Sequence, residues 1–222
     1  MGAAANNAVL TVACVYKPGG GFSDEYVYRL QDGIAEHCNV PYKFVCLTNS
    51  RLKNIETVAL STNRIGYWNK LELFRNDLFD GPVVYLDLDT IIVGDITDML
   101  IYPHEFTAGL NFKAKHGRSL ASWFLGFDGC EDYSYLIDEY KPSTPTEYEQ
   151  DWSRWGDQGF INNNLRREWQ SLDEIGFANR YASYKWHIRR PGKIPDGCDI
   201  VCFHGKPRPH EINWTLPKWQ QR

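Results

Sequence analysis

The sequence predicts a layered α/β fold, and three observations support this prediction. Short apolar runs typical of buried strands alternate with segments of helical spacing along the 222 residues. The first run, at 9–16, is followed by a glycine-rich turn, an amphipathic segment and a second run at 42–47, the order of a βαβ unit. Hydrophobic residues make up 43% of the chain, enough for one domain with a substantial core.

The elements follow one another in a regular order. After the first strand, the sequence predicts a helix from Ser23, as its N-cap, to His37, with apolar residues on one face. We expect further strands at 42–47, 58–60, 83–86, 106–110, 123–127 and 200–203. We expect further helices at 69–78, with Lys70 off the apolar stripe, at 95–101, at 133–140 and from 157 onward, and a loop at 142–145.

Composition and charge limit the possible functions. The net charge of −4 argues against a protein that binds nucleic acid through its overall charge. The charge is uneven, with a net of −7 over residues 128–157 and +5 over 185–222. The basic end could face a polyanion such as a diphosphate, or could be an ordinary solvated surface.

The cysteines and the chain ends indicate a reduced, cytoplasmic protein. The six cysteines include no Cys-x-x-Cys pair, which argues against a zinc site. The chain shows no signal peptide and no long apolar span, although association with a membrane surface is compatible with this. Residues 1–7 are small and polar and are predicted to be a disordered end.

Two carboxylates follow the central apolar run at 83–86. Asp87 and Asp89 are one residue apart, so on a continuing strand both would project to one side while Leu88 points to the other. Ligands of open α/β sheets bind at the carboxyl ends of strands, and paired acids there suit a hard divalent cation. The alternative is a polar turn in which Asp89 or Asp95 caps a helix, because Asp-x-Asp alone is a weak motif.

A glycine run at 17–21 follows the first strand. It lacks the Gly-Lys-Ser/Thr ending of a P-loop and the spacing of a dinucleotide fingerprint. Lys17 and the open backbone could contact a nucleotide, and a flexible connection is equally consistent. Asp157, at the start of a later helix, could similarly be only a first-turn acid.

A second strand also ends in residues suited to this chemistry. The strand at 200–203 runs directly into His204, Gly205 and Lys206. A lone histidine is usually structural, but here glycine allows close backbone approach and lysine suits phosphate. Together with the Asp pair, these residues predict a metal–diphosphate site that neutralises charge on a leaving diphosphate.

With these motifs the chain resembles glycosyltransferases of the GT-A fold, most closely family 8 and its bacterial relatives, which include glycogenin and bacterial lipopolysaccharide galactosyltransferases. The resemblance rests on segments 84–95, 156–162 and 201–209, with Lys70 and the opening strand at Tyr16. These pieces span nearly the whole chain in the family's order. The resemblance implies a single domain over 1–222, a Rossmann-like α/β/α sandwich with a mixed, mostly parallel central sheet.

The resemblance also implies roles for individual residues. It implies Mn²⁺ or Mg²⁺ held by Asp87, Asp89 and His204, with one of the two acids near the ribose. Lys206 would contact the diphosphate, and Lys70 the diphosphate or the sugar. Asp157 and Gln158 would be the catalytic residues that hold the donor sugar beside its anomeric carbon. The other residues that would bind the nucleotide sugar are Tyr16, Lys17, Thr48, Asn49, Leu88 and Gly205.

The implied function is transfer of a hexose from a nucleotide-diphosphate sugar, UDP-glucose or UDP-galactose, to an acceptor hydroxyl. The resemblance suggests retention, either by same-face attack or through a covalent intermediate on Asp157. The acceptor could be a saccharide, a lipid-linked glycan, a protein or a modified nucleobase. The chain departs from the family at His210, where tryptophan is common, at 121–126, and in its short length.

Other functions are compatible with the same residues. A nucleotidyltransferase or a sugar-nucleotide hydrolase could use the same metal–diphosphate site. In a non-catalytic glycan-binding module, Trp123, Trp152 and Trp155 would stack against a sugar and the acids would bind a structural ion.

Overall fold

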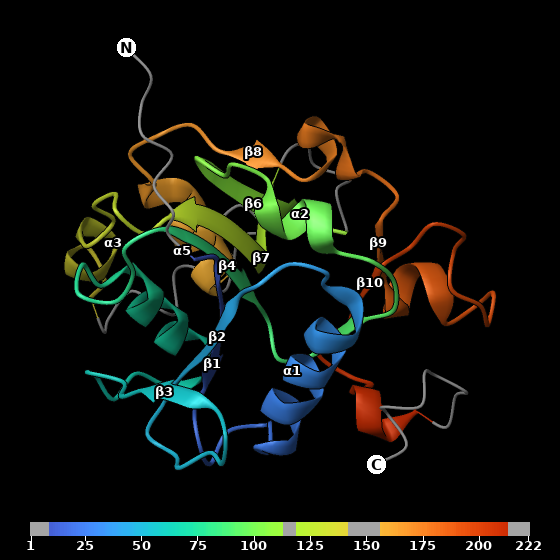
Figure 1. Cartoon of the computed structure of the whole chain (residues 1–222), viewed down its shortest axis with the longest axis horizontal. Helices are drawn as coiled ribbons and strands as arrows, with labels where there is room; N and C mark the ends of the chain where they lie inside the picture. Colours follow the sequence, from blue (N-terminus) through green and yellow to red (C-terminus); the bar gives the residue numbers. More distant parts are fainter. Residues whose placement is uncertain (1–8, 113–118, 142–155, 213–222) are drawn as a thin grey trace.

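The computed structural model describes residues 9–112, 119–141 and 156–212 (Figure 1). The predicted disordered end at 1–7, the loop at 142–145, and Trp152 and Trp155 lie outside the described residues. In the part of the chain that is described, no helix combines the length and the apolar character needed to cross a bilayer. All six cysteines are free thiols.

A seven-stranded mixed sheet forms the centre of the molecule, in the order β3-β2-β1-β4-β7-β6-β8 (Figure 1). Strands β3, β2, β1 and β4 pair in parallel, β7 is antiparallel to β4 and β6, and β8 is parallel to β6. The predicted mixed, mostly parallel sheet is confirmed. The strands are β1 (Thr11–Tyr16), β2 (Lys43–Thr48), β3 (Glu56–Val58), β4 (Pro82–Leu86), β6 (Phe106–Leu110), β7 (Leu120–Asp128) and β8 (Gln170–Ser171).

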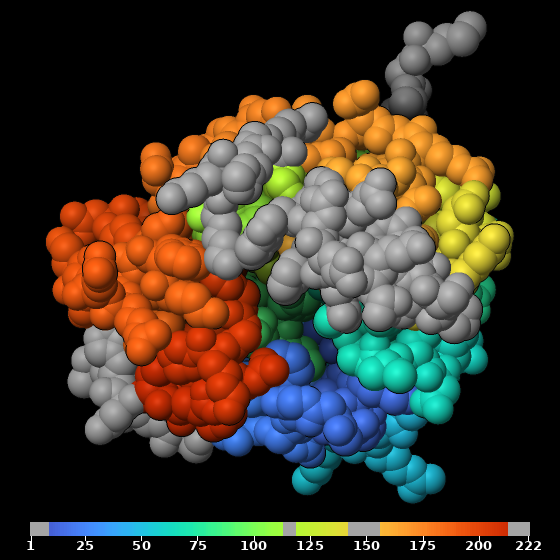
Figure 2. Space-filling model, turned by 180° about the vertical axis from the view of Figure 1, so that it is seen from behind, coloured from blue at the N-terminus to red at the C-terminus, as the bar shows by residue number. Residues whose placement is uncertain are grey.

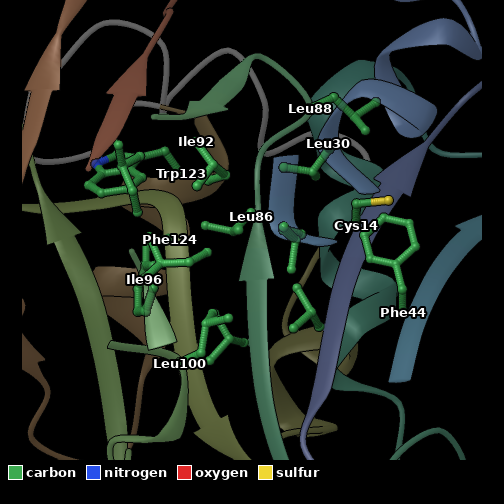
Figure 3. Close-up of a cluster of buried hydrophobic side chains, with 14 of the residues drawn as sticks. Cys14, Leu30, Phe44, Leu86, Leu88, Ile92, Ile96, Leu100, Trp123 and Phe124 are labelled. Carbon is green, nitrogen blue, oxygen red and sulfur yellow. The ribbon is translucent and has the colours of Figure 1, made fainter. Parts of the chain in front are cut away.

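Helices cover both faces of this sheet because its inner strands are apolar on both sides. Along β1, Val12 and Cys14 join one core with α1 (Glu25–His37) and α2 (Thr97–Ile101), part of which is shown in Figure 3. Ala13 joins the opposite core with the 3-10 helix η1 (Gly66–Phe74), α3 (Tyr135–Asp138) and α5 (Gly156–Asn164). The result is an α/β/α sandwich.

A second, three-stranded sheet lies beside the first, in the order β5-β10-β9. Its strands are β5 (Thr90–Ile92), β10 (Ile200–Cys202) and β9 (Tyr181–Ser183), and β10 runs antiparallel to β5. Arg180, just before β9, forms an ion pair of 2.6 Å with Asp98 of α2 and another with Asp199 before β10. These contacts fasten the small sheet to the helix layer of the large one.

The structure differs from the predicted elements in several places. The N-cap of α1 is Asp24, not Ser23, and the segment predicted as a helix at 69–78 is the 3-10 helix η1. Five short elements had no recognisable period in the sequence, because each spans only a few residues. They are β8, β9, the π-helical turns η3 (Asp173–Phe177) and η4 (Tyr184–Ile188), and the 3-10 turn η5 (Pro209–Glu211).

Candidate functional site

A cavity of about 650 Å³ opens at the carboxyl ends of β1 and β4. Three of its walls follow strands: the turn after β1, the turn after β4 and the segment after β10. The others come from strand β7 and from the starts of η1 and α5. Figure 2 shows a hollow on this face of the molecule, bordered by the blue N-terminal, teal and red C-terminal segments. Segments far apart in the sequence therefore contribute side chains to one space.

The Asp pair lies in the turn between β4 and β5, not on a continuing strand. The amide of Thr90 donates to the carbonyl of Asp87 at 3.1 Å, and the amide of Asp87 donates to the carbonyl of Trp123 at 2.9 Å. The carboxylate of Asp87 also accepts a hydrogen bond from the Tyr85 hydroxyl. Asp87 and Asp89 both line the cavity, so the turn brings together the two acids that strand alternation was expected to align.

Asp89 is a buried acid beside another acid. Only 8% of the residue is exposed, and burial together with the negative charge of Asp87 raises the pKa of the Asp89 carboxyl to about 8. The guanidinium of Arg208, 3.5 Å away, partly opposes this shift. Two neighbouring carboxylates, whose mutual repulsion raises the pKa of one of them, are a donor set that fits a hard divalent cation.

The segment carrying His204 meets the Asp turn through the small sheet. Thr90 pairs with Cys202, and the amide of Phe203 donates to the carbonyl of Asp89 at 3.0 Å. His204 lines the same cavity, and its Nε2 lies 2.6 Å from the hydroxyl oxygen of Ser183. Among the described residues, no three His, Cys, Asp or Glu side chains gather closely enough to hold a metal ion. The three-residue ligand set therefore stays a prediction.

Lys70 links the Asp turn to the start of α5. Its ammonium lies 3.0 Å from Asp87 and 2.6 Å from Asp157, and the residue is only 4% exposed. Burial alone would lower the pKa of this ammonium, but the charges of Asp157 and Asp87 raise it above its ordinary value. Lys70 is thus a buried, charged side chain that lines the cavity.

Strand β7 contributes Ala121, Ser122 and Trp123 to the cavity beside a bulge. The register of β7 on β6 shifts between Ala108 and Gly109, which re-aims residues 122–124 of β7. The hydroxyl of Ser122 donates to Asp157 at 2.7 Å and lies 2.8 Å from the ammonium of Lys70. Trp123 also lines the cavity. The sequence did not indicate this shift in register. Residues 123–127 are apolar on both faces of the strand, so a change in which face they present leaves no change in the pattern.

The close packing at the bulge predicts that a substitution at Gly109 destabilises the protein. A Cβ at Gly109 would lie 2.2 Å from Nε1 of the buried Trp123 indole, so Gly109→Ala should force the strand or the ring to move. We expect a loss of about 1–3 kcal/mol in the free energy of unfolding, measured by urea denaturation. The control is Gly33→Ala in α1, where the nearest atom is 3.4 Å away and a helical alanine should be neutral or stabilising. Equal stability of the two variants would contradict the prediction.

Only some of the other predicted residues reach the cavity. Lys17, Leu88, Gln158 and Gly205 line it, and the ammonium of Lys17 also donates to Asn63 at 2.8 Å. The side chains of Thr48 and Asn49 instead accept from nearby backbone amides, and the Lys206 side chain is 86% exposed. The predicted residues that do not line the cavity are Tyr16, Thr48, Asn49 and Lys206.

The cavity residues that were not predicted from the sequence include Ser122, Lys185 and Arg208. Arg208 stands two residues after Lys206 in the same basic segment, so the sequence contained a signal for it. Its guanidinium lies 4.0 Å above the ring of Phe22 and fits against Gly21, where a Cβ would be 2.8 Å from Nη2. Lys185 donates to the carbonyl of His204 at 2.9 Å and belongs to a turn with no recognisable pattern.

Comparison with models of protein families finds no match, and the same is true of a comparison with curated proteins. Solved structures do match. The glycosyltransferase GlyE of Streptococcus pneumoniae TIGR4 aligns with a TM-score of 0.66 and 16% identity over 97% of this chain. The chain spans 59% of the length of GlyE.

A second match covers most of both proteins. The galactosyltransferase LgtC, solved with donor and acceptor sugar analogues, aligns with a TM-score of 0.61 and 11% identity. The alignment covers 95% of this chain and 93% of LgtC. The chain therefore has the GT-A fold that its sequence motifs predict, the fold of the glycosyltransferases GlyE and LgtC.

Proposed function

We propose that this chain is a glycosyltransferase that moves a hexose from a nucleotide-diphosphate sugar, UDP-glucose or UDP-galactose, to an acceptor hydroxyl. The observation that carries the proposal is the shared cavity of Asp87, Asp89 and His204, which come from two segments more than 100 residues apart. The GT-A fold supports it independently.

The donor's diphosphate would lie at the Asp turn. Asp87, Asp89 and His204 would hold Mn²⁺ or Mg²⁺ there, and such an ion neutralises the negative charge that develops on a leaving diphosphate. Asp89 must first give up its proton, because its pKa is raised to about 8. Lys17 and Arg208 also line the cavity and would add positive charge near the phosphate oxygens.

The hexose would lie over Lys70, Asp157 and Gln158. Asp157 is 7% exposed, and its Oδ2 is engaged by both Lys70 and Ser122. A carboxylate held in this way is well suited to accept a hydrogen bond from a sugar hydroxyl and to fix the ring. Ionic and hydrogen bonds to that oxygen also reduce its strength as a nucleophile, which favours same-face attack over a covalent intermediate.

The reaction can be tested directly. Purified protein is incubated with Mn²⁺ and a panel of nucleotide sugars, with and without acceptor saccharides, and the released nucleotide is measured. We expect UDP release from one UDP-hexose that increases when an acceptor is added. Equal release without any acceptor would favour a hydrolase, and glycan binding without release from any donor would favour a binding module.

Arg208, and not Lys206, is proposed as the main protein cation for the diphosphate. Arg208 lines the cavity, is stacked on Phe22 and lies 3.5 Å from Asp89, whereas the Lys206 ammonium lies 3.9 Å from Glu211 on an exposed side chain. Arginine presents a rigid, planar set of donors that matches phosphate oxygens. The role implied by the family resemblance for Lys206 is thereby reassigned within the same segment.

Two matched substitutions test this assignment. Arg208→Gln is expected to weaken UDP binding about 10–100-fold, the effect of removing a charge-assisted hydrogen bond of roughly 1.5–3 kcal/mol. Lys206→Gln, which removes the same charge two residues away, should leave the affinity nearly unchanged. Calorimetry with UDP and with uridine separates the diphosphate contribution from the base contribution. A larger loss of UDP affinity in Lys206→Gln would return the role to Lys206.

A further inference from the structure

A single hydroxyl lies between the two charged groups at the base of the cavity. Ser122 is 2% exposed, and its Oγ donates to Oδ2 of Asp157 at 2.7 Å. The same oxygen accepts from the ammonium of Lys70 at 2.8 Å, and the Ser122 carbonyl accepts from that ammonium at 3.1 Å. Lys70, Asp157 and Ser122 therefore form a closed set of hydrogen bonds in which the hydroxyl both donates and accepts.

The bulge in β7 gives this hydroxyl its position. Ser122 stands at the point where the pairing of β7 with β6 loses its register. The next residue, Trp123, accepts a hydrogen bond through its carbonyl from the amide of Asp87, at 2.9 Å. Two neighbouring residues of one bulge thus hold the backbone of the Asp turn and the side chain of Asp157. A bulge of this kind re-aims side chains and is common beside functional sites.

We infer that Ser122 is a positioning residue, which fixes the Lys70 ammonium and the Asp157 carboxylate relative to the Asp turn so that they meet the donor hexose in one geometry. The ammonium of Lys70 can pair with either of two acids, Asp87 at 3.0 Å and Asp157 at 2.6 Å. Without the hydroxyl, Asp157 loses one of its two partners on Oδ2 and can rotate about its side-chain bonds. The inference rests on the proposed function and adds a residue that acts on the hexose end of the donor only.

The inference predicts different effects on two measurable quantities, the affinity for UDP and the turnover number. UDP has no hexose, so its affinity should not depend on the Ser122 hydroxyl. The turnover number with UDP-glucose or UDP-galactose should depend on it, because small displacements of positioning groups reduce the rate of the chemical step. For Ser122→Ala we expect kcat to fall on the order of 10–100-fold, with the Kd of UDP unchanged.

Two further variants keep the test clear. Ser122→Cys keeps a side chain of the same shape but provides a poor hydrogen-bonding group, so it should lose kcat as Ser122→Ala does. Thr107→Val is the matched control. Thr107, in β6, is fully buried, and its hydroxyl has no hydrogen-bond partner among the described residues, so removing that hydroxyl should leave kcat unchanged. Melting temperatures of all three variants monitor folding.

The outcomes distinguish this inference from the proposed function. If wild-type protein releases UDP from neither donor, the proposed function fails and the inference with it. If wild-type protein turns over and Ser122→Ala keeps its kcat, only the inference fails. It also fails if Ser122→Ala loses UDP affinity in parallel with kcat, because Ser122 would then support the whole site and not the hexose end.

Discussion

Asp89→Asn is expected to abolish cation-dependent release of nucleotide from a UDP-hexose. The substitution keeps the size of the side chain but removes one of two adjacent carboxylates at the cavity. A bound divalent ion stabilises the leaving diphosphate by several kcal/mol, so its loss should reduce kcat by roughly 10³-fold or more. The rate is measured as UDP release in Mn²⁺, and Mn²⁺ affinity is measured separately by calorimetry. Full activity in this variant would refute the metal assignment.

A control for this variant is the pH dependence of the free energy of unfolding, measured without any metal. Burial and the charge of Asp87 raise the pKa of Asp89 to about 8, above its ordinary value of 3.8. The native state therefore holds a proton that the unfolded chain releases, and the resulting stabilisation is complete below about pH 4 and is lost as pH rises towards 8. The free energy of unfolding of the wild type should fall over this range, and Asp89→Asn should lack that component. Mn²⁺ should bind the wild type more tightly as pH rises, because it must displace the proton.

Lys70→Met is expected to be the most destabilising of the substitutions considered. It leaves Asp87 and Asp157 in the site without the ammonium that lies within 3.0 Å of both. Removing one partner of a buried ion pair costs about 3–5 kcal/mol, which lowers the melting temperature of a domain of this size by about 10 °C. Turnover should be lost as well, because both acids would shift. Urea denaturation and UDP release measure the two effects.

Lys43→Met is the matched control for that loss. Lys43 also forms an ion pair, with Glu56 at 2.8 Å, but both side chains are about half exposed. An exposed pair contributes about 0–1 kcal/mol, so this variant should remain close to the wild type in stability and in turnover. If the two variants lost similar amounts of stability, burial of the Lys70 network would not be the reason for its contribution. Adding Asp157→Asn to Lys70→Met should recover part of the loss, since one uncompensated charge is removed.

The sequence predicted the large sheet well because the inner strands are apolar on both faces. Continuous apolar runs at β1, β2 and β4 are readable without knowledge of their neighbours, and the Asp pair follows the last of them directly. The predicted strand at 106–110 coincides with β6. The fold class and the meeting of Asp89 with the segment of His204 could therefore be anticipated.

The parts that were missed depend on contacts between distant segments. Lys70 was predicted as a site residue, but not its burial, which Asp87 and Asp157 permit by compensating its charge from distant positions in the sequence. Ser122 reaches the site through a shift in register that depends on how β6 and β7 pair. Arg208 is stabilised over Phe22, nearly two hundred residues earlier in the chain. The local hydrophobic periodicity of a sequence does not indicate which distant residues will contact one another.

Insertions and deletions should be tolerated in the connection at 189–197 but not within β5 or β10. The amide of Phe203 donates to the carbonyl of Asp89 one residue beyond the antiparallel ladder between β5 and β10, directly beside His204. Adding or deleting one residue within either strand would turn every following side chain to the opposite face and carry the imidazole out of the cavity. The exposed connection at 189–197 lies outside this ladder, and lengthening such a loop costs little. Homologues or engineered variants can therefore differ in size there while they keep the acid and the imidazole together.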